Sequence, residues 1–297
     1  MTHAFDPTPD RRLLLGVSLV ALLALGISVS REASPSWKAA QQGARAAISA
    51  RLGADKASAM PSGLAQVRIE ALARVDRCIT CHVGIEGGAA FADLPGLARS
   101  HPRPELLAAH PVEKFGCTLC HGGRGAAVTK EEAHGDDEFC DDPLWSAERA
   151  RRHGLSAAEL LEGRCNVCHR ADATTAGMPF LDAAKTLVKT ASVEGKRCAS
   201  CHRIDGRGGS AGPDLGTIGD VPAAQRSFPD GYRGPRTGLG WHAAHIRQPK
   251  SMVPTSEMKE FGFTEREAMS LALLVSSWKA PVLPPAWIPA PGRTPPK

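Results

Sequence analysis

Residues 195–202, with the sequence GKRCASCH, contain the pattern that decides how this chain folds. Two cysteines are separated by two residues and followed at once by a histidine. The same pattern occurs three more times, beginning at Cys78, Cys117 and Cys165, which leaves Cys140 as the one unpaired cysteine among nine. With 11 histidines in 297 residues, four such coincidences have a chance probability on the order of 10⁻⁶.

Cys-x-x-Cys-His is the attachment signature of c-type haem, in which two thiols add to the haem vinyl groups and the histidine binds the iron. A bare Cys-x-x-Cys also occurs in zinc, redox and iron–sulfur sites, but these leave four equally placed histidines unexplained. The sequence therefore predicts four covalently bound haems c. The predicted attachment residues are Cys78, Cys81, Cys117, Cys120, Cys165, Cys168, Cys198 and Cys201, with proximal ligands His82, His121, His169 and His202.

The composition fits a chain whose cores are completed by haem. Aromatic residues are only 5% of the sequence, while 30 glycines and 23 prolines predict many turns and short elements. We expect a mainly α, loop-rich fold. The net charge of +5 gives little support to nucleic-acid binding. Residues 186–297 hold 15 Lys and Arg against 9 Asp and Glu, a net charge of +6, which favours an acidic partner for this part.

The N-terminus carries a membrane signal. Residues 13–29 have no charge and follow Arg11 and Arg12, and no Ala-x-Ala cleavage site ends the stretch. We predict an uncleaved transmembrane signal anchor over residues 1–32, with a cleaved signal peptide as the alternative.

Composition shifts divide the rest of the chain. An Ala- and Ser-rich tether with helical stretches is expected over residues 33–65, and a short helix over 66–76 opens a trihaem module that extends to residue 184. A separate monohaem domain is expected over residues 185–280. It closes with a helix over 264–279 that begins with a Thr-x-x-Glu capping box. Seven prolines in residues 281–297 predict an extended tail.

Residues 193–280 resemble the class I cytochrome c family in the attachment site, the Gly-Pro-Asp-Leu turn at 212–215, a methionine loop and the terminal helix. The resemblance implies that Met258 is the sixth iron ligand and that the Pro213 carbonyl holds the ring of His202. The family usually has proline where this chain has Lys259. Met252 is the rival ligand, His242 and His245 are further alternatives, and Met258 as a core residue stays open.

The trihaem region contains its own spare histidines. The demand of three irons for sixth ligands favours His101, His110 and His134, with Met178 as an alternative at the third motif. Which histidine serves which iron stays open. His153, between Arg152 and Gly154, is expected at an exposed helix end. The stretch 101–134 resembles multihaem cytochromes that accompany bacterial cytochrome b or bc-type quinol complexes.

Residues 131–142 hold seven acidic residues and no Lys or Arg. A solvated loop is the simplest interpretation, and docking of a cationic partner or calcium binding is the alternative, although no EF-hand spacing is present. Cys140 lies in this stretch, where it is expected as a free thiol or in an intermolecular disulfide.

Together these features predict an electron carrier without catalytic residues, because no nucleophile, base or oxyanion set is identifiable. The resemblances imply a cytochrome held on the bacterial inner membrane with its haem domains in the periplasm. They also imply a membrane quinol-oxidising complex as donor, and the charge favours an acidic acceptor. The alternatives are a haem-based reductase with one open iron and, less favoured, a redox or gas sensor.

Overall fold

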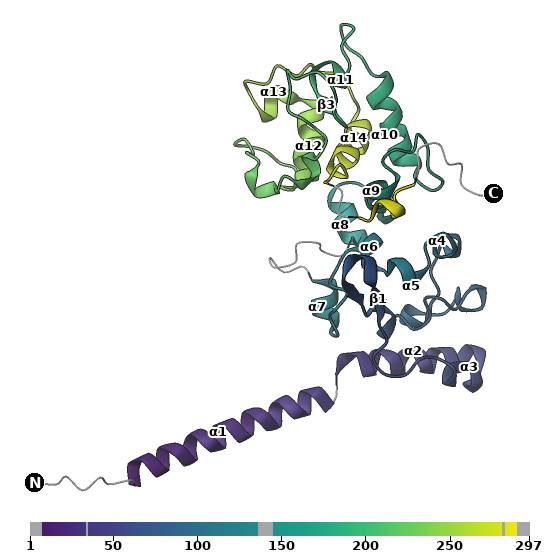
Figure 1. The fold of residues 1–297 in the computed structure, drawn as a ribbon, viewed down its shortest axis with the longest axis vertical. Helices are drawn as coiled ribbons and strands as arrows, with labels where there is room; N and C mark the ends of the chain where they lie inside the picture. Colours follow the sequence, from purple (N-terminus) through teal and green to yellow (C-terminus); the bar gives the residue numbers. More distant parts are fainter. Residues whose placement is uncertain (1–7, 34, 136–144, 281–282, 290–297) are drawn as a thin grey trace, which may run out of the picture. The chain divides into compact units, whose positions relative to one another are not determined.

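The computed structural model describes residues 8–33, 35–135, 145–280 and 283–289. The chain divides into two compact units (Figure 1). Unit 1 comprises residues 1–69, 74–116 and 124–137, and unit 2 comprises residues 70–73, 117–123 and 138–297. The described residues are mainly helical, with two short antiparallel hairpins, as the composition predicts.

Helix α1 spans Thr8–Ala33 and contains the predicted apolar segment. Residues Arg11–Ser30 form a stretch of 20 residues that is long and apolar enough to cross a membrane, and none of it is buried within the protein. At 1.5 Å per residue, such a stretch spans about 30 Å, the thickness of a bilayer's hydrocarbon core. The helix fits either a membrane anchor or a signal sequence.

The expected tether is instead a folded part of unit 1. Helix α2 (Ser36–Leu52) is followed by α3 (Ala54–Ser58), and α2 buries Ala44 and Ile48 in a small core with Phe91, Leu94 and Ala98. Two small or branched side chains one helical turn apart suffice for this contact, so the sequence shows no wide apolar stripe.

The first motif is attached to α2 by a buried polar contact. Gln41, which is 5% exposed, donates from Nε2 to the carbonyl of Thr80 at 2.8 Å and to that of Gly63 at 2.7 Å. Thr80 lies inside the first Cys-x-x-Cys-His motif. Because a buried amide is costly unless it is hydrogen-bonded, these bonds fix the motif against the helix.

The helix expected over residues 66–76 is a hairpin instead. Strand β1 (Val67–Ile69) pairs with antiparallel β2 (Arg74–Asp76), and the turn between them includes η1 (Glu70–Leu72). Val67 and Ile69 alternate with charged residues, and this period of two is typical of a strand. The other helical elements of unit 1 are η2 (Cys78–Thr80), η3 (Ala89–Phe91), η4 (Gly96–Ala98), α4 (Pro104–Ala109), α5 (Val112–Phe115) and α7 (Lys130–His134).

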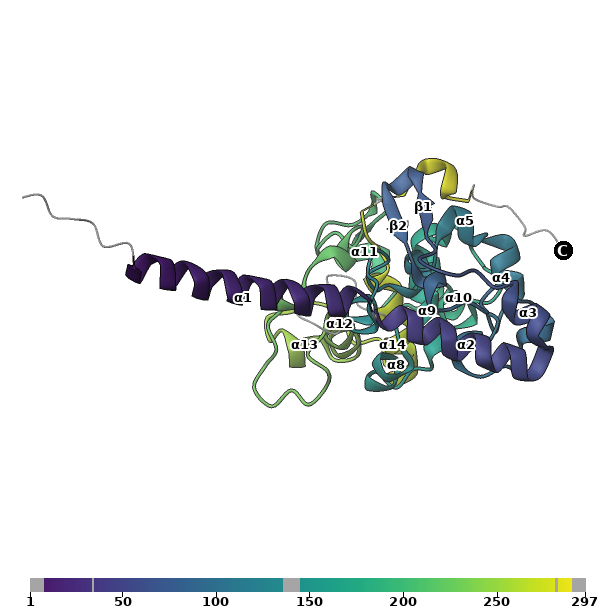
Figure 2. The same ribbon diagram turned by 90° about the horizontal axis from the view of Figure 1, so that it is seen from below.

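Unit 2 is built around helix α14, which packs against α9, α10 and α12; Figures 1 and 2 show α12 and α14 side by side. The predicted terminal helix is present, but it ends at Ser276 rather than at residue 279. Thr264 caps α14 by accepting from the backbone N–H of Glu267, whose carboxylate accepts from Thr264 N. The helices are α6 (Thr118–His121), α8 (Ala147–Arg152), α9 (Ala157–His169), α10 (Pro179–Thr190), α11 (Cys198–Cys201), α12 (Gly238–Arg247), α13 (Pro249–Met252) and α14 (Glu265–Ser276).

Short elements complete unit 2. Strands β3 (Arg203–Ile204) and β4 (Arg207–Gly208) form the second hairpin directly after the fourth motif. Single 3₁₀ turns occur in the connections and after α14: η5 (Ile218–Asp220), η6 (Ala223–Gln225) and η7 (Pro285–Trp287). Of the predicted tail, residues 281–282 and 290–297 lie outside the described residues.

The boundary expected between residues 184 and 185 falls inside α10 rather than in a linker. Phe180, Leu181 and Ala184 are buried from this helix in the same core as Leu271 and Leu274 of α14. The helix is strongly amphipathic, and its apolar face is covered by both α9 and α14. The helix carrying the third motif and the terminal helix therefore share one hydrophobic core.

Candidate haem-attachment sites

Each motif folds as one helical turn, which brings its two thiols and its imidazole together. In the first, second and fourth motifs the backbone N–H of the histidine donates to the carbonyl of the first cysteine, at 3.0, 2.9 and 2.9 Å respectively. The third motif forms the last turn of α9. None of the eight motif cysteines, all of them described, forms a disulfide. This arrangement is what two thioether bonds and a proximal ligand on one haem require.

The third motif is the most firmly supported of the four. Helix α9 begins with a capping box between Ser156 and Glu159, and two buried polar side chains tie it to its neighbours. Asn166 Nδ2 donates to Ser277 Oγ at 2.7 Å, and Glu162 Oε2 accepts from the backbone N–H of Leu181 at 2.7 Å. Burial raises the pKa of Glu162, while hydrogen bonds from the backbone of Leu181 and Phe180 act in the opposite direction and stabilise the carboxylate.

The second and third motifs lie close together within unit 2. Arg164, on α9, donates from Nε and Nη2 to the carbonyl of Leu119 at 3.1 and 3.0 Å, and Leu119 lies inside the second motif. Burial, and then the neighbouring Cys120, raises the pKa of Cys165 to about 12 and that of Cys168 to about 11. Neutral thioether sulfurs suit such a buried position better than thiolates do.

At the fourth motif, the predicted proximal ligand, His202, makes the contact that the family resemblance implies. His202 Nδ1 lies 2.9 Å from the Pro213 carbonyl, which can accept its N–H. Gly212 packs directly against the ring, because a Cβ there would stand 2.5 Å from His202 Cε1. Gly208, with a φ of 116°, makes a similarly close approach to the His202 carbonyl. The carbonyl fixes the tautomer that leaves Nε2 as the metal-binding nitrogen.

At the third motif, the predicted proximal ligand, His169, lies next to a carboxylate. His169 Nδ1 lies 2.7 Å from Asp172 Oδ2, and the Asp172 side chain is 11% exposed. Lys185 secures this turn, since its Nζ donates to the carbonyls of His169 and Asp172, both at 2.9 Å. Sequence reasoning missed Asp172. Its three-residue spacing from His169 at a helix end was the available signal.

Four side chains are candidates for the sixth position at the fourth motif, and one of them, His242, is 6% exposed on α12. Met258 lies half-buried in the irregular segment before α14, where its N–H donates to Ser256 Oγ at 3.3 Å. Met252 ends α13 and is 4% exposed. Burial lowers the pKa of His245, which lies on α12. The nearby imidazole of His202 lowers it further. Met258 stays the predicted ligand, and His245 is its nearest histidine rival.

The first motif in unit 1 has a second histidine near its predicted proximal ligand, His82. The ring centroids of His82 and His134 are 6.3 Å apart, and their planes make an angle of 72°. Burial, followed by the neighbouring His134, lowers the pKa of His82, which favours the neutral imidazole that binds metals.

The two other predicted distal histidines of unit 1 are held by local backbone contacts. His101 Nδ1 lies 2.9 Å from the Arg103 carbonyl, and His110 Nδ1 lies 3.1 Å from that of Leu106. A carbonyl at Nδ1 favours the tautomer that ligates through Nε2. Both therefore stay predicted ligands whose irons are not assigned.

Two sequence expectations change here. His153 does end a helix, α8, but it is 9% exposed rather than exposed. Met178, the alternative ligand at the third motif, is 1% exposed within the apolar core and acts as a core residue. Residues 136–144, with Cys140 and much of the acidic stretch, lie outside the described residues.

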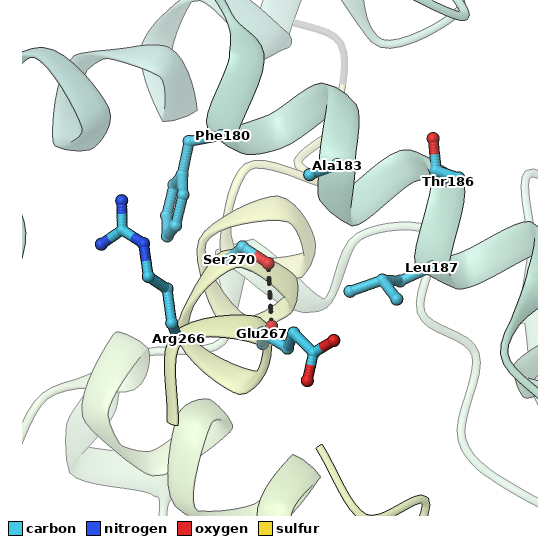
Figure 3. Close-up of a pocket in the computed structure, with 7 residues that line it drawn as sticks. All are labelled: Phe180, Ala183, Thr186, Leu187, Arg266, Glu267 and Ser270. Atoms are coloured by element: carbon cyan, nitrogen blue, oxygen red, sulfur yellow. Dashed lines mark hydrogen bonds between the residues drawn. The ribbon is translucent and has the colours of Figure 1, made fainter. Parts of the chain in front are cut away.

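A pocket between α10 and α14 lies apart from these motifs (Figure 3). Phe180 and Leu187 line it from α10, and Arg266, Glu267 and Ser270 line it from α14. Arg266 lies over the Phe180 ring, and Ser270 Oγ donates to the Glu267 carbonyl at 2.8 Å. No lining residue is a cysteine, histidine or methionine, so the pocket is not one of the haem sites.

The comparisons with known proteins agree with the geometry of the fourth motif. The family model Cytochrome c matches residues 181–277. Neither the comparison with curated proteins nor that with solved structures found a match. The matched segment includes most of α10, the fourth motif, the Pro213 turn, Met258 and α14. This part of the chain is therefore similar to cytochrome c, which supports covalently bound haem and a haem-based electron-transfer role.

Proposed function

We propose that the chain is a membrane-anchored tetrahaem cytochrome that carries electrons. The observation that supports it most is that all four motifs, not only the one in the cytochrome c domain, form the same turn with a histidine at its end. Haem c supplies a one-electron Fe(III)/Fe(II) couple at each site. The chain's residues attach it, bind its iron and set its potential.

The proposed direction of electron flow follows from the ligands. Met258 as a thioether ligand would raise the potential of the fourth haem, whereas imidazole pairs would hold those of the other three lower. Electrons would then enter through the three motifs that begin at residues 78, 117 and 165, and leave through the cytochrome c domain. His101, His110 and His134 are the proposed sixth ligands of the entry haems.

The proposed partners follow from the two ends of the chain. Helix α1 would anchor it in the bacterial inner membrane, next to a quinol-oxidising cytochrome b or bc-type complex as donor, with the haem sites in the periplasm. The C-terminal region, with its net charge of +6 over residues 186–297, suits an acidic acceptor. Such an encounter would slow as ionic strength rises.

Intact-mass measurement of the matured full chain tests the haem count. We expect roughly 2.5 kDa above the polypeptide mass, as four attached haems require. A matched variant with Cys78 and Cys81 both replaced by serine should lose one quarter of that increment. An increment of three haems or fewer in the fully matured wild type would contradict the tetrahaem proposal.

Truncation tests the donor. A chain that begins at Ala33 behind a cleavable signal should lose reduction by membrane quinol, because its proximity to the donor is lost. Its electron transfer to a soluble acceptor should persist with the same salt dependence. If quinol-linked reduction survives the truncation, the segment does not act as an anchor or the donor is not in the membrane.

A further inference from the structure

The separation of the His82 and His134 rings in unit 1 fits that of two imidazoles bound to one metal ion. Their ring centroids lie 6.3 Å apart. A histidine nitrogen lies about 2.0 Å from a transition metal that it binds. The same nitrogen lies about 1.1 Å from the centre of its own five-membered ring. Two such rings on opposite sides of one ion therefore have centroids about 6.2 Å apart.

We propose that His134 is the sixth ligand of the iron whose proximal ligand is His82. The inference rests on the proposed function in one respect, namely that Cys78 and Cys81 carry a haem. It goes further by selecting one distal histidine for one iron, which the sequence leaves open among His101, His110 and His134.

Backbone contacts explain why a residue so far along the chain lies next to the first motif. Arg77, which directly precedes Cys78, donates from its backbone N–H to the Gly125 carbonyl at 2.7 Å and from Nη1 to the Ala126 carbonyl at 2.6 Å. The 124–134 segment then closes on itself, because Arg124 N donates to the Ala133 carbonyl at 2.9 Å. Arg77 thereby fixes the segment that carries His134 next to the first motif.

The short helix that ends at His134 is itself fixed at its start. Thr129 caps α7 by accepting from the backbone N–H of Glu132 at 3.3 Å. The ring of His110, by comparison, packs edge-on against Phe115 with centroids 5.5 Å apart, and His101 contacts the backbone of Arg103. The geometry therefore selects His134 at the first motif without removing the other two as ligands elsewhere.

The angle between the rings adds a spectroscopic signature. The planes of His82 and His134 make an angle of 72°, which is close to perpendicular. When the two imidazole planes are parallel, the iron dxz and dyz orbitals differ in energy. When the planes are perpendicular, these two orbitals are nearly equal in energy. The first haem should therefore give a strongly anisotropic low-spin ferric EPR signal.

The test uses the full chain with its haems attached. His134→Ala should remove the anisotropic signal and convert one haem of the four to high spin, with the haem count by mass unchanged. Added imidazole should restore the low-spin state, which a merely structural role of His134 would not produce. His134→Met should keep the haem low-spin and raise its potential. Glu132→Ala, on the same helix, is the matched control and should keep the signal.

Two further variants distinguish the possible failures. Replacing Cys78 and Cys81 by serine should remove the same anisotropic signal, which assigns it to the first haem, and His110→Ala should leave it in place. If His134→Ala retains four low-spin haems, or if its high-spin haem is not the one on Cys78 and Cys81, the assignment is overturned. If the wild type carries no haem on Cys78 and Cys81, the proposed function fails instead.

Discussion

The third and fourth motifs lie in the same unit, yet the histidines predicted as their proximal ligands lie against different acceptors. His169 meets the carboxylate of Asp172 at 2.7 Å, whereas His202 meets the carbonyl of Pro213 at 2.9 Å. A carboxylate draws the ring N–H more strongly than a carbonyl does, which makes the other ring nitrogen a better electron donor. The more basic ligand stabilises ferric iron and lowers the potential.

The two sites also differ in how their backbones are held. The third motif ends a 13-residue helix held in the core by Asn166 and Glu162, whereas the fourth is an isolated turn enclosed by glycines. The third motif, proposed for a lower potential, therefore has a rigid helix and a charged acceptor. The fourth motif, proposed for a higher potential, has closely packed backbone instead.

The largest effect is expected from Met258→His. An imidazole in place of a thioether should keep the fourth haem low-spin and lower its potential by roughly 100 mV or more, because imidazole stabilises ferric iron better. A spectropotentiometric titration of the full chain measures the shift. Met252→Leu is the control and should leave the highest potential where it is. If Met252→Leu moves it and Met258→His does not, the ligand assignment is reversed.

A smaller shift of opposite sign is expected at the third motif. Asp172→Asn replaces a charged acceptor with a neutral one, which should raise the potential of one haem by about 50 mV, since 59 mV corresponds to a tenfold change for one electron. Asp214→Asn is the control. Asp214 is exposed and accepts from Gly216 N at 2.7 Å, next to Pro213. Equal shifts in the two variants would mean that net charge, rather than the contact with His169, sets the potential.

Gly212→Ala should disturb only the fourth site. The added Cβ would stand 2.5 Å from His202 Cε1, so the ring must move and its bond to Pro213 must weaken. Overpacking of this kind costs about 1–3 kcal/mol in the free energy of unfolding. Gly238→Ala is the control, since its Cβ would meet only Arg226 Nε at 3.9 Å. Denaturant unfolding followed at the haem bands would show no difference between the two variants if the close packing were unimportant.

The smallest expected effect on stability at neutral pH concerns His153, which precedes α9. Its Nε2 lies 3.4 Å from Thr237 Oγ1 at the start of α12. Burial, then Arg149 and Arg152, lowers the pKa of His153 from 6.5 to about 4. The unfolded chain therefore binds a proton that the folded chain excludes, and stability should fall as the pH drops from 6.5 towards 4.

The loss attributable to His153 should approach about 3 kcal/mol at the acid end of that range. His153→Gln should remove this part of the pH dependence while leaving stability at pH 8 nearly unchanged. Unfolding midpoints measured between pH 8 and pH 4.5 test it. If the unfolding midpoint changed with pH to the same extent in the wild type and in the variant, the His153 ring would be hydrated in the folded chain.

The sequence predicted the parts of the molecule that depend on local chemistry. The motif turns and the capping box at Thr264 follow from residues close together in the chain, and the Pro213 contact follows from the resemblance to class I cytochrome c. It did not predict how segments share a core. The burial of α2 depends on Phe91 and Leu94, and the place of α10 depends on α14, both distant in the chain. The contact of Asp172 with His169 could be predicted from the three-residue spacing only if the end of α9 were already known.

The claim that the chain conducts electrons rather than reacting with a small molecule depends on every iron having two protein ligands. The EPR spectrum of the fully oxidised, haem-loaded chain tests this most directly. We predict four low-spin ferric haems, one of them strongly anisotropic, and no high-spin component at pH 7. A full equivalent of high-spin ferric iron in the wild type would contradict the account and favour a reductase with one open haem.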